Sequence, residues 1–247
     1  MPRMERRLAV VTGGATGIGR AAAAALAGRG DQVVLLGRRA EVLERAAAEL
    51  GARWRRADVS RREDVRAAVD WLVAEVGAPV DVLVNNAGGT GGLADGAPLD
   101  QAEAAFDALV DGNLKGSFLM AWALAPHLRR PGGRIINLAS IAAWSGRGGL
   151  YTVAKAGVVG LTYWLALRLG PEGITVNAVA PGFVEGTEFF GGGLDAAGRA
   201  ERVGQIPTGR PGRPEEVAAA VAYLASPEAA YVNGEIHHVN GGWLMGR

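Results

Sequence analysis

The residues best suited to acid–base chemistry are a tyrosine and a lysine four positions apart, Tyr151 and Lys155. In a helix this spacing places both side chains on one face. An ammonium group beside a phenol stabilises the phenolate and lowers the tyrosine pKa from ~10 toward neutral pH. Such a phenol can exchange a proton with a carbonyl oxygen. Because a Tyr-x-x-x-Lys pair is common by chance, the surrounding sequence must decide whether this one does so.

Other polar residues are predicted to lie near this pair. Ser140 follows the apolar run Arg134–Leu138, so its hydroxyl could hydrogen-bond the same oxygen. Asn113 falls within the helical pattern Leu99–Leu128, where an asparagine is unfavourable unless its side chain has a specific role. Ser145 offers a second hydroxyl, but its place beyond the strand makes it the poorer candidate.

A glycine-rich turn follows the first apolar run and opens a helical pattern. Residues 12–19 read TGGATGIG. Gly13 permits a tight turn, and Gly17 and Gly19 leave room for a phosphate at the helix start, where free N–H groups and the helix dipole favour an anion. The spacing departs from strict G-x-G-x-x-G, so the strand before it and the helix after it carry the dinucleotide interpretation. The alternative is an ordinary glycine-rich turn.

The second apolar run is followed by two arginines, Arg38 and Arg39. In dinucleotide-binding folds an acidic residue near this point binds the ribose 2′-hydroxyl of NAD. Guanidinium groups instead suit a 2′-phosphate, so the sequence favours NADP(H) over NAD(H). The alternative is a solvated arginine pair before a helix. Asp58, after the third run, could accept from the adenine amino group or cap a helix beginning near Ser60.

Short apolar runs alternate with longer helical patterns along the whole chain. The predicted strands are Leu8–Thr12, Gln32–Leu36, Arg53–Arg55, Val80–Val84, Arg134–Leu138, Thr175–Val179 and Ile236–Val239. The predicted helices are Gly17–Gly28, Ala40–Leu50, Arg61–Val76, Leu99–Leu128, Leu150–Leu169 and Pro214–Ala225. Runs that are apolar on both faces are typical of strands in a parallel sheet. The alternation therefore predicts one doubly wound α/β domain over residues 1–247.

The stretch Pro181–Pro207 is the longest without clear periodicity, and three glycines occupy positions 191–193. We expect a functional lid over the substrate, the alternatives being disorder or a short helix. Phe183, Phe189 and Phe190, with few charges before Asp195, favour an apolar or mixed substrate over a polar sugar.

Composition narrows the classes of partner. The formal net charge is +1, from 26 basic and 25 acidic residues, which makes nucleic acid an improbable partner. The absence of cysteine excludes disulfides and thiolate chemistry and fits a cytoplasmic location. Leu8–Val11 is too short for a signal segment, and no apolar run approaches the ~18 residues of a membrane span. His127, His237 and His238 lack zinc-ligand spacing, so no metal is expected.

Taken together, these motifs resemble those of the short-chain dehydrogenase/reductase family, in order and over essentially the whole chain. The matching segments are TGGATGIG, NNAG at 85–88, Ser140 with Tyr151-x-x-x-Lys155, Pro181-Gly182 and the ending VNGGW. The resemblance implies a Rossmann-type parallel sheet of about seven strands with three helices on each face.

Roles follow from the resemblance position by position. Tyr151 corresponds to the catalytic acid/base, and Lys155 to the residue that lowers its pKa and binds the nicotinamide ribose. Ser140 corresponds to the group that orients the substrate oxygen, and Asn113 to the residue that holds a water of the proton relay. The residues expected at the cofactor are Gly13, Thr16, Gly17, Ile18, Gly19, Arg38, Arg39, Asp58, Val59, Asn86, Ala87, Gly88, Tyr151, Lys155, Pro181, Gly182, Val184 and Thr187.

Two positions depart from the family pattern. The gap of 11 residues from Ser140 to Tyr151 is shorter than usual, and it borders the substrate. Thr187 also comes later after Pro181-Gly182 than in many relatives, which weakens its assignment to the cofactor.

Within the family, the segments ITVNAVAPGFVEGT and IPTGRPGRPEEVAAAVAYLAS are most similar to 3-oxoacyl-ACP reductases, which use NADPH. The alternatives are a polyketide ketoreductase or a secondary alcohol, sugar or steroid dehydrogenase, and, more distantly, a non-catalytic NADP-sensing regulator. The resemblance also implies a homotetramer or homodimer, with the ending GEIHHVNGGWLMGR at a subunit interface.

Overall fold

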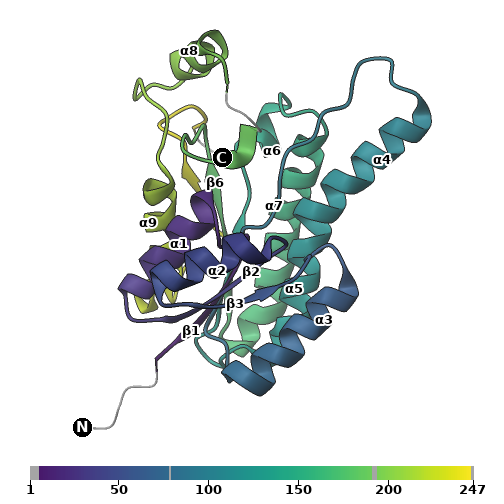
Figure 1. Cartoon of the computed structure of the whole chain (residues 1–247). Coiled ribbons are helices and arrows are strands. Elements are labelled where there is room, and N and C mark those ends of the chain that lie inside the picture. Colours follow the sequence, from purple (N-terminus) through teal and green to yellow (C-terminus); the bar gives the residue numbers. More distant parts are fainter. Residues whose placement is uncertain (1–5, 78, 191–193, 246–247) are drawn as a thin grey trace.

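The computed structural model describes residues 6–77, 79–190 and 194–245. Its centre is a seven-stranded parallel sheet with the order β3-β2-β1-β4-β5-β6-β7 (Figure 1). The strands are β1 (Leu8–Thr12), β2 (Gln32–Gly37), β3 (Arg53–Arg56), β4 (Val82–Asn85), β5 (Arg134–Leu138), β6 (Thr175–Pro181) and β7 (Ile236–Val239). The predicted fold class is confirmed.

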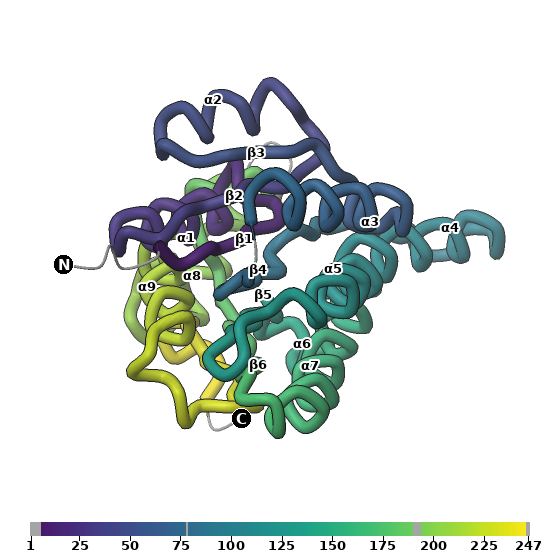
Figure 2. The backbone as a smooth tube through the Cα atoms, turned by 90° about the horizontal axis from the view of Figure 1, so that it is seen from below, coloured from purple at the N-terminus to yellow at the C-terminus, as the bar shows by residue number. Residues whose placement is uncertain are grey.

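Helices cover both faces of this sheet. They are α1 (Gly17–Gly28), α2 (Ala40–Leu50), α3 (Arg62–Trp71), α4 (Leu99–Val110), α5 (Gly116–Leu124), α6 (Ala142–Ser145), α7 (Leu150–Leu169), α8 (Ala196–Gly204) and α9 (Pro214–Leu224). One apolar cluster joins α1, α2 and α9 to one face, and another joins α3, α5 and α7 to the opposite face. Figure 2 shows these layers on either side of the strands, and Figure 1 shows α4 projecting beyond them.

Burial explains why the strands were legible in the sequence. Every residue of β1, β5 and β6 is buried, because helices lie on both faces of the sheet. The edge strand β3 is instead rich in arginine, and the guanidinium groups of Arg53 and Arg55 lie 5.2 and 5.4 Å from the ring of Trp71. Charged side chains on an edge strand discourage pairing with other chains.

Three predicted elements differ in their bounds. The helix predicted over Arg61–Val76 runs as α3 over Arg62–Trp71 and continues as a π-helical turn over Leu72–Val76. The fourth strand begins at Val82 rather than Val80, and Val80 forms an isolated bridge instead. The predicted helix Leu99–Leu128 is interrupted by a π-helical turn over residues 111–115 and ends before Leu128. Leu128 instead bridges to Val80.

The segment after β6 contains a helix that the sequence pattern did not reveal. Helix α8 has no buried residue, and Val203 is the one large apolar residue in its sequence AAGRAERVG, so no apolar run marks it as a helix. It is stabilised at its start by Asp195, whose carboxylate accepts from the Gly198 N–H at 2.8 Å. The glycines at 191–193 lie outside the described residues.

The segment Leu150–Glu172, which includes α7, is long and apolar enough to cross a membrane by length and composition alone. In this fold it packs against β6 and buries Lys155 and Thr162 among apolar neighbours. The segment therefore serves as a core helix here.

Candidate active site

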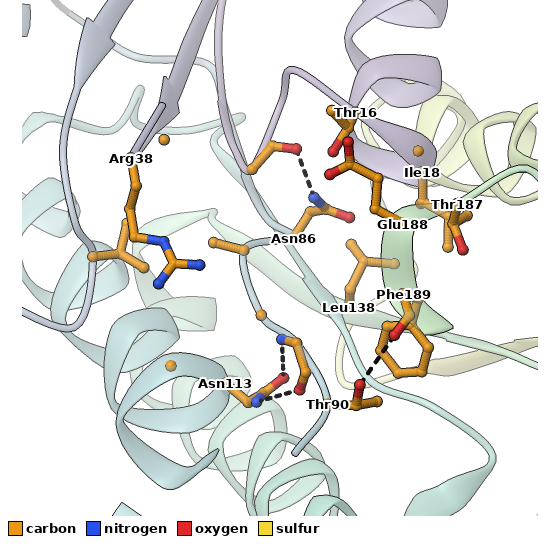
Figure 3. Close-up of a pocket in the computed structure, with 18 of the residues that line it drawn as sticks. Thr16, Ile18, Arg38, Asn86, Thr90, Asn113, Leu138, Thr187, Glu188 and Phe189 are labelled. Carbon is orange, nitrogen blue, oxygen red and sulfur yellow. Dashed lines mark hydrogen bonds between the residues drawn. The ribbon is translucent and has the colours of Figure 1, made fainter. Parts of the chain in front are cut away.

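A cavity of about 980 Å³ runs along the carboxyl edge of the sheet, where α/β folds bind their ligands. It is lined by all the predicted cofactor and catalytic residues except Gly19 (Figure 3). A Cβ at Gly19 would lie 2.2 Å from the Gly13 carbonyl oxygen, so this glycine lets the helix start pack against the turn.

The glycine turn between β1 and α1 has the geometry expected of a phosphate site. Gly13 and Gly17 have φ values of +62° and +51°, which glycine adopts without strain. The N-cap residue Thr16 makes no side-chain cap, and the first turn of α1 carries no acidic residue. The N–H groups at this helix start are therefore suited to an anion at the cavity.

The amide side chain of Asn86, directly after β4, holds backbone of the glycine turn. Asn86 Nδ2 donates to the carbonyl oxygens of Thr12 (3.0 Å) and Gly13 (3.1 Å). In return, Thr12 Oγ1 accepts from the N–H groups of Asn86 and Ala87, both at 3.0 Å. These four bonds fix the glycine turn against the neighbouring strand end.

Two arginines line the end of the cavity beside β2. Arg38 points into the cavity (Figure 3) and has no ion pair within 4.0 Å among the described residues. Arg39 also lines the cavity, but its guanidinium pairs with Glu188 at 2.6 Å. Of the two arginines, Arg38 is therefore the one whose guanidinium forms no ion pair among the described residues and could bind a 2′-phosphate.

Asp58 lies beside these arginines and does not cap a helix. Its carboxylate accepts from the N–H (3.0 Å) and hydroxyl (2.7 Å) of Ser60, whereas α3 begins only at Arg62. The capping alternative is therefore wrong. Burial raises the pKa of Asp58, but the Ser60 bonds and the charges of Arg38 and Arg61 outweigh it and lower the pKa overall.

Asn113 occupies the π-helical turn between α4 and α5, a distortion that often marks functional sites. Its Nδ2 donates to the carbonyls of Gly89 and Leu109, both at 3.0 Å, and its Oδ1 accepts from the Gly89 N–H at 3.3 Å. The residue thus clamps the chain that leaves β4. A side chain at Gly88 would lie 2.4 Å from Asn113 Oδ1, which explains that glycine.

Tyr151 and Lys155 lie one turn apart near the start of α7, only 9% and 4% exposed. Lys155 Nζ donates to the Leu138 carbonyl at 2.7 Å and lies 5.5 Å from the Tyr151 ring centroid. Ser140 hydrogen-bonds the Tyr151 hydroxyl, and its own Oγ accepts from the Ala142 N–H at 3.1 Å. Three of the four predicted catalytic side chains, those of Ser140, Tyr151 and Lys155, therefore line the same part of the cavity.

Burial dominates the ionisation of this pair. It raises the pKa of Tyr151, although the hydrogen bond from Ser140 opposes it, and it lowers the pKa of Lys155 to about 8. The direction for Tyr151 is opposite to the lowering that a nearby ammonium favours. Without a bound ligand, the cost of burying charge therefore outweighs the attraction between the Lys155 ammonium and a Tyr151 phenolate.

The segment after β6 contributes two further side chains to the cavity: Phe189, which the sequence already offered as an apolar wall of the predicted lid, and Glu188, which it did not reveal. Phe189 lies edge-on to the Tyr151 ring, with centroids 5.3 Å apart, and its carbonyl accepts from Thr90 Oγ1 at 3.0 Å. Glu188 reaches Arg39 across the cavity. An acidic residue beside an aromatic one in the predicted lid was the available signal. Phe183, in contrast, is buried and does not line this cavity.

The short gap before Tyr151 is filled by α6. This four-residue helix ends at Gly146, whose φ is +67°, and Gly149, with φ of +55°, leads into α7. Ser145 closes α6 outside the cavity lining, and its hydroxyl accepts from the Arg147 N–H at 3.4 Å. Of the two candidate hydroxyls, Ser140 is the one beside Tyr151.

Comparison with known proteins agrees with this geometry. A family model described as enoyl-(acyl carrier protein) reductase matches residues 13–244. Nodulation protein G of Rhizobium sp. (strain N33) is 43% identical over 97% of each chain, and a 3-oxoacyl-[acyl-carrier-protein] reductase of Vibrio cholerae is 38% identical over 98% of this chain and 99% of its own. The chain belongs to the short-chain dehydrogenase/reductase family.

A solved structure supports the membership. A dehydrogenase/reductase from Sinorhizobium meliloti 1021 superimposes with a TM-score of 0.87 and 35% identity, covering 97% of this chain and 95% of its own. As a short-chain dehydrogenase/reductase, the protein is an oxidoreductase whose family acts on CH–OH and C=O groups with nicotinamide cofactors.

The free energy of unfolding of the natural chain is expected to rise with pH above 8 because of Lys155, and Lys155→Met is expected to remove this rise. Because burial lowers the lysine pKa from 10.5 to about 8, the cost of protonating it in the fold is full below pH 8 and disappears as pH rises toward 10.5. The unfolding free energy of the variant relative to the natural chain should fall by about 2 kcal/mol between pH 7 and 9.5.

Urea unfolding of both proteins without cofactor measures this difference. Lys115→Met is the matched control, because Lys115 is an exposed lysine paired with Asp111. If Lys155→Met changes the free energy of unfolding by the same amount at pH 7 and pH 9.5, the lowered pKa of Lys155 is contradicted.

Proposed function

We propose that the protein reduces a ketone to a secondary alcohol with NADPH, most closely as a 3-oxoacyl-ACP reductase does. The observation that carries this proposal is that Tyr151, Ser140 and Lys155 line the same cavity, with Lys155 one turn from Tyr151 on α7. The cavity fits a dinucleotide, since it extends from Arg38 past the glycine turn to Tyr151. Bound NADPH would supply the hydride to the carbonyl carbon.

The chain's own residues supply the proton and the polarisation. Tyr151 gives its Oη proton to the carbonyl oxygen as that oxygen becomes an alcohol. Ser140 donates a hydrogen bond to the same oxygen and stabilises the charge that develops there. The Lys155 ammonium favours the phenolate left on Tyr151. Asn113 holds the adjoining backbone in place through Gly89.

Removal of the Tyr151 hydroxyl tests the chemistry. Tyr151→Phe is expected to lower kcat at least 100-fold, the usual scale of a lost general acid, which is ~10²–10⁴. NADPH affinity should change less than about threefold, because the aromatic ring remains. Steady-state rates and a fluorescence titration with NADPH measure both. Full activity in this variant would contradict the role of Tyr151 as the general acid.

Arg38 supports NADP(H) as the cofactor, because it offers a free guanidinium where an NAD-binding chain places a carboxylate. Arg38→Leu is expected to weaken NADPH binding about 10- to 100-fold, from the loss of a charge-assisted contact, and NADH binding less than about twofold. Arg20→Leu is the control, since Arg20 pairs with Glu49 and does not line the cavity. Equal losses for both cofactors would contradict the role.

The substrate is proposed to be an acyl thioester with a 3-oxo group. The relatives named 3-oxoacyl-ACP reductase and the apolar Phe189 wall support it. Initial rates with acetoacetyl thioesters against free ketones, sugars and steroids test the choice, and we expect the thioesters to have the highest kcat/KM. Faster turnover of free ketones, sugars or steroids would favour the alternative dehydrogenases. NADPH binding without turnover of any carbonyl would favour a sensor.

The proposal includes a closed homodimer or homotetramer in the cytoplasm. The rings of Trp122 and Trp164 stack at 5.9 Å on the surface of α5 and α7, although 46% and 43% of these residues are exposed. Leu99 on α4 and Leu167 on α7 are each 81% exposed as well. A second copy of the chain would bury such a face with closed symmetry.

A further inference from the structure

One short segment of the lid contacts both ends of the cavity. We call Thr187–Phe189 the latch segment. Its Glu188 carboxylate accepts two hydrogen bonds from the Arg39 guanidinium, at 2.6 and 3.4 Å, on the adenosine side. The next residue, Phe189, packs against the ring of Tyr151. Figure 3 shows Glu188 and Phe189 on this segment, with Thr90 bonded to the Phe189 carbonyl.

We propose that Glu188 is a selectivity residue that couples recognition of the cofactor's 2′-phosphate to exposure of Tyr151. In the free chain Glu188 occupies the Arg39 guanidinium and holds the latch segment over Tyr151. The 2′-phosphate of NADP(H) displaces Glu188 from Arg39 and releases the latch segment. The inference rests on the proposed function for the identity of this phosphate.

The exchange is favourable because the two anions differ in strength. The Arg39–Glu188 pair is 57% and 62% exposed, and exposed pairs contribute little because water competes for both groups. A phosphate monoester carries about −1.5 to −2 charge at pH 7 and three acceptor oxygens, against a single charge on Glu188. Arg38 lines the same end of the cavity and adds a second guanidinium. NAD(H) has no 2′-phosphate that could replace Glu188 on the Arg39 guanidinium.

Release of the latch segment has a direct consequence for catalysis. Phe189 covers one face of Tyr151, which is only 9% exposed. A carbonyl substrate must reach the Tyr151 hydroxyl, so Phe189 must move aside before it binds. Coupling this movement to the 2′-phosphate makes the cofactor bind first and keeps the tyrosine covered until it has.

The same loop provides a matched control. Glu185 lies three residues before Glu188 and also forms an exposed ion pair, but its partner is Arg199 on α8 rather than Arg39. Glu185→Gln therefore removes an equal charge and an equal class of contact from the loop without touching the proposed coupling.

A binding cycle tests the competition at Arg39. Glu188→Gln should bind NADPH about two- to fivefold more tightly, the scale of an exposed ion pair, and leave NADH affinity unchanged. In an Arg39→Gln background, Glu188→Gln should have no effect on NADPH. If Glu188→Gln strengthens NADPH binding equally without Arg39, the carboxylate repels the phosphate directly and the latch is overturned.

A thiol probe tests the movement, because the chain contains no cysteine of its own. The Phe189→Cys variant is alkylated with iodoacetamide in the presence of 2′,5′-ADP or 5′-AMP, which occupy only the adenosine end. We expect 2′,5′-ADP to speed alkylation at least threefold and 5′-AMP to have no effect. Adding Glu188→Gln should make alkylation fast without any nucleotide, whereas adding Glu185→Gln should change nothing.

The outcomes separate this inference from the function on which it rests. If 2′,5′-ADP binds more tightly than 5′-AMP but the alkylation rate does not change, the coupling is overturned and the NADP assignment stands. If 2′,5′-ADP binds no more tightly than 5′-AMP, both are overturned.

Discussion

The architecture depends on a chain of buried hydrogen bonds through the centre of the sheet. Asn137 of β5, fully buried, accepts from Asn85 of β4 at 3.0 Å and donates to Thr162 of α7 at 2.9 Å. Asn85 also donates to the Ser117 carbonyl of α5. Buried amides are costly unless paired, so these bonds favour one register of two strands and two helices, although Asn85 Oδ1 has no partner among the described residues. Tyr151 and Lys155 lie on one of these elements, α7, and Asn86 and Ser140 follow β4 and β5.

The sequence predicted most of this arrangement because the sheet is buried on both faces. Strands of that kind read as apolar runs, and polar residues directly after them must meet at one edge. The features that were not predicted are local: α8 has no buried residue, and Val80 pairs with Leu128 outside the named strands. The Arg39–Glu188 contact joins positions 149 residues apart, and no periodic pattern encodes such a pairing.

The electrostatics of the site favour uncharged groups until a ligand arrives. Burial raises the pKa of Tyr151 and lowers that of Lys155, so the fold by itself disfavours both the phenolate and the ammonium. The Leu138 carbonyl partly offsets this by accepting from Lys155 Nζ. Charge at this wall must therefore be stabilised by whatever completes the cavity, which ties the reactivity of the tyrosine to an occupied site.

The π-helical turn at 111–115 changes the relative rotation of α4 and α5 about their shared helical path. One extra residue in a helix of 3.6 residues per turn rotates everything before it by about 100° relative to everything after it. This rotation lets α5 continue to bury Met120 and Leu124 while α4 exposes Leu99 and Phe106. A deletion that restored a regular helix would rotate Asn113 away from Gly89. It would also change which residues of α4 face solvent. The inner chemistry and the outer surface of this helix are therefore bound to change as one.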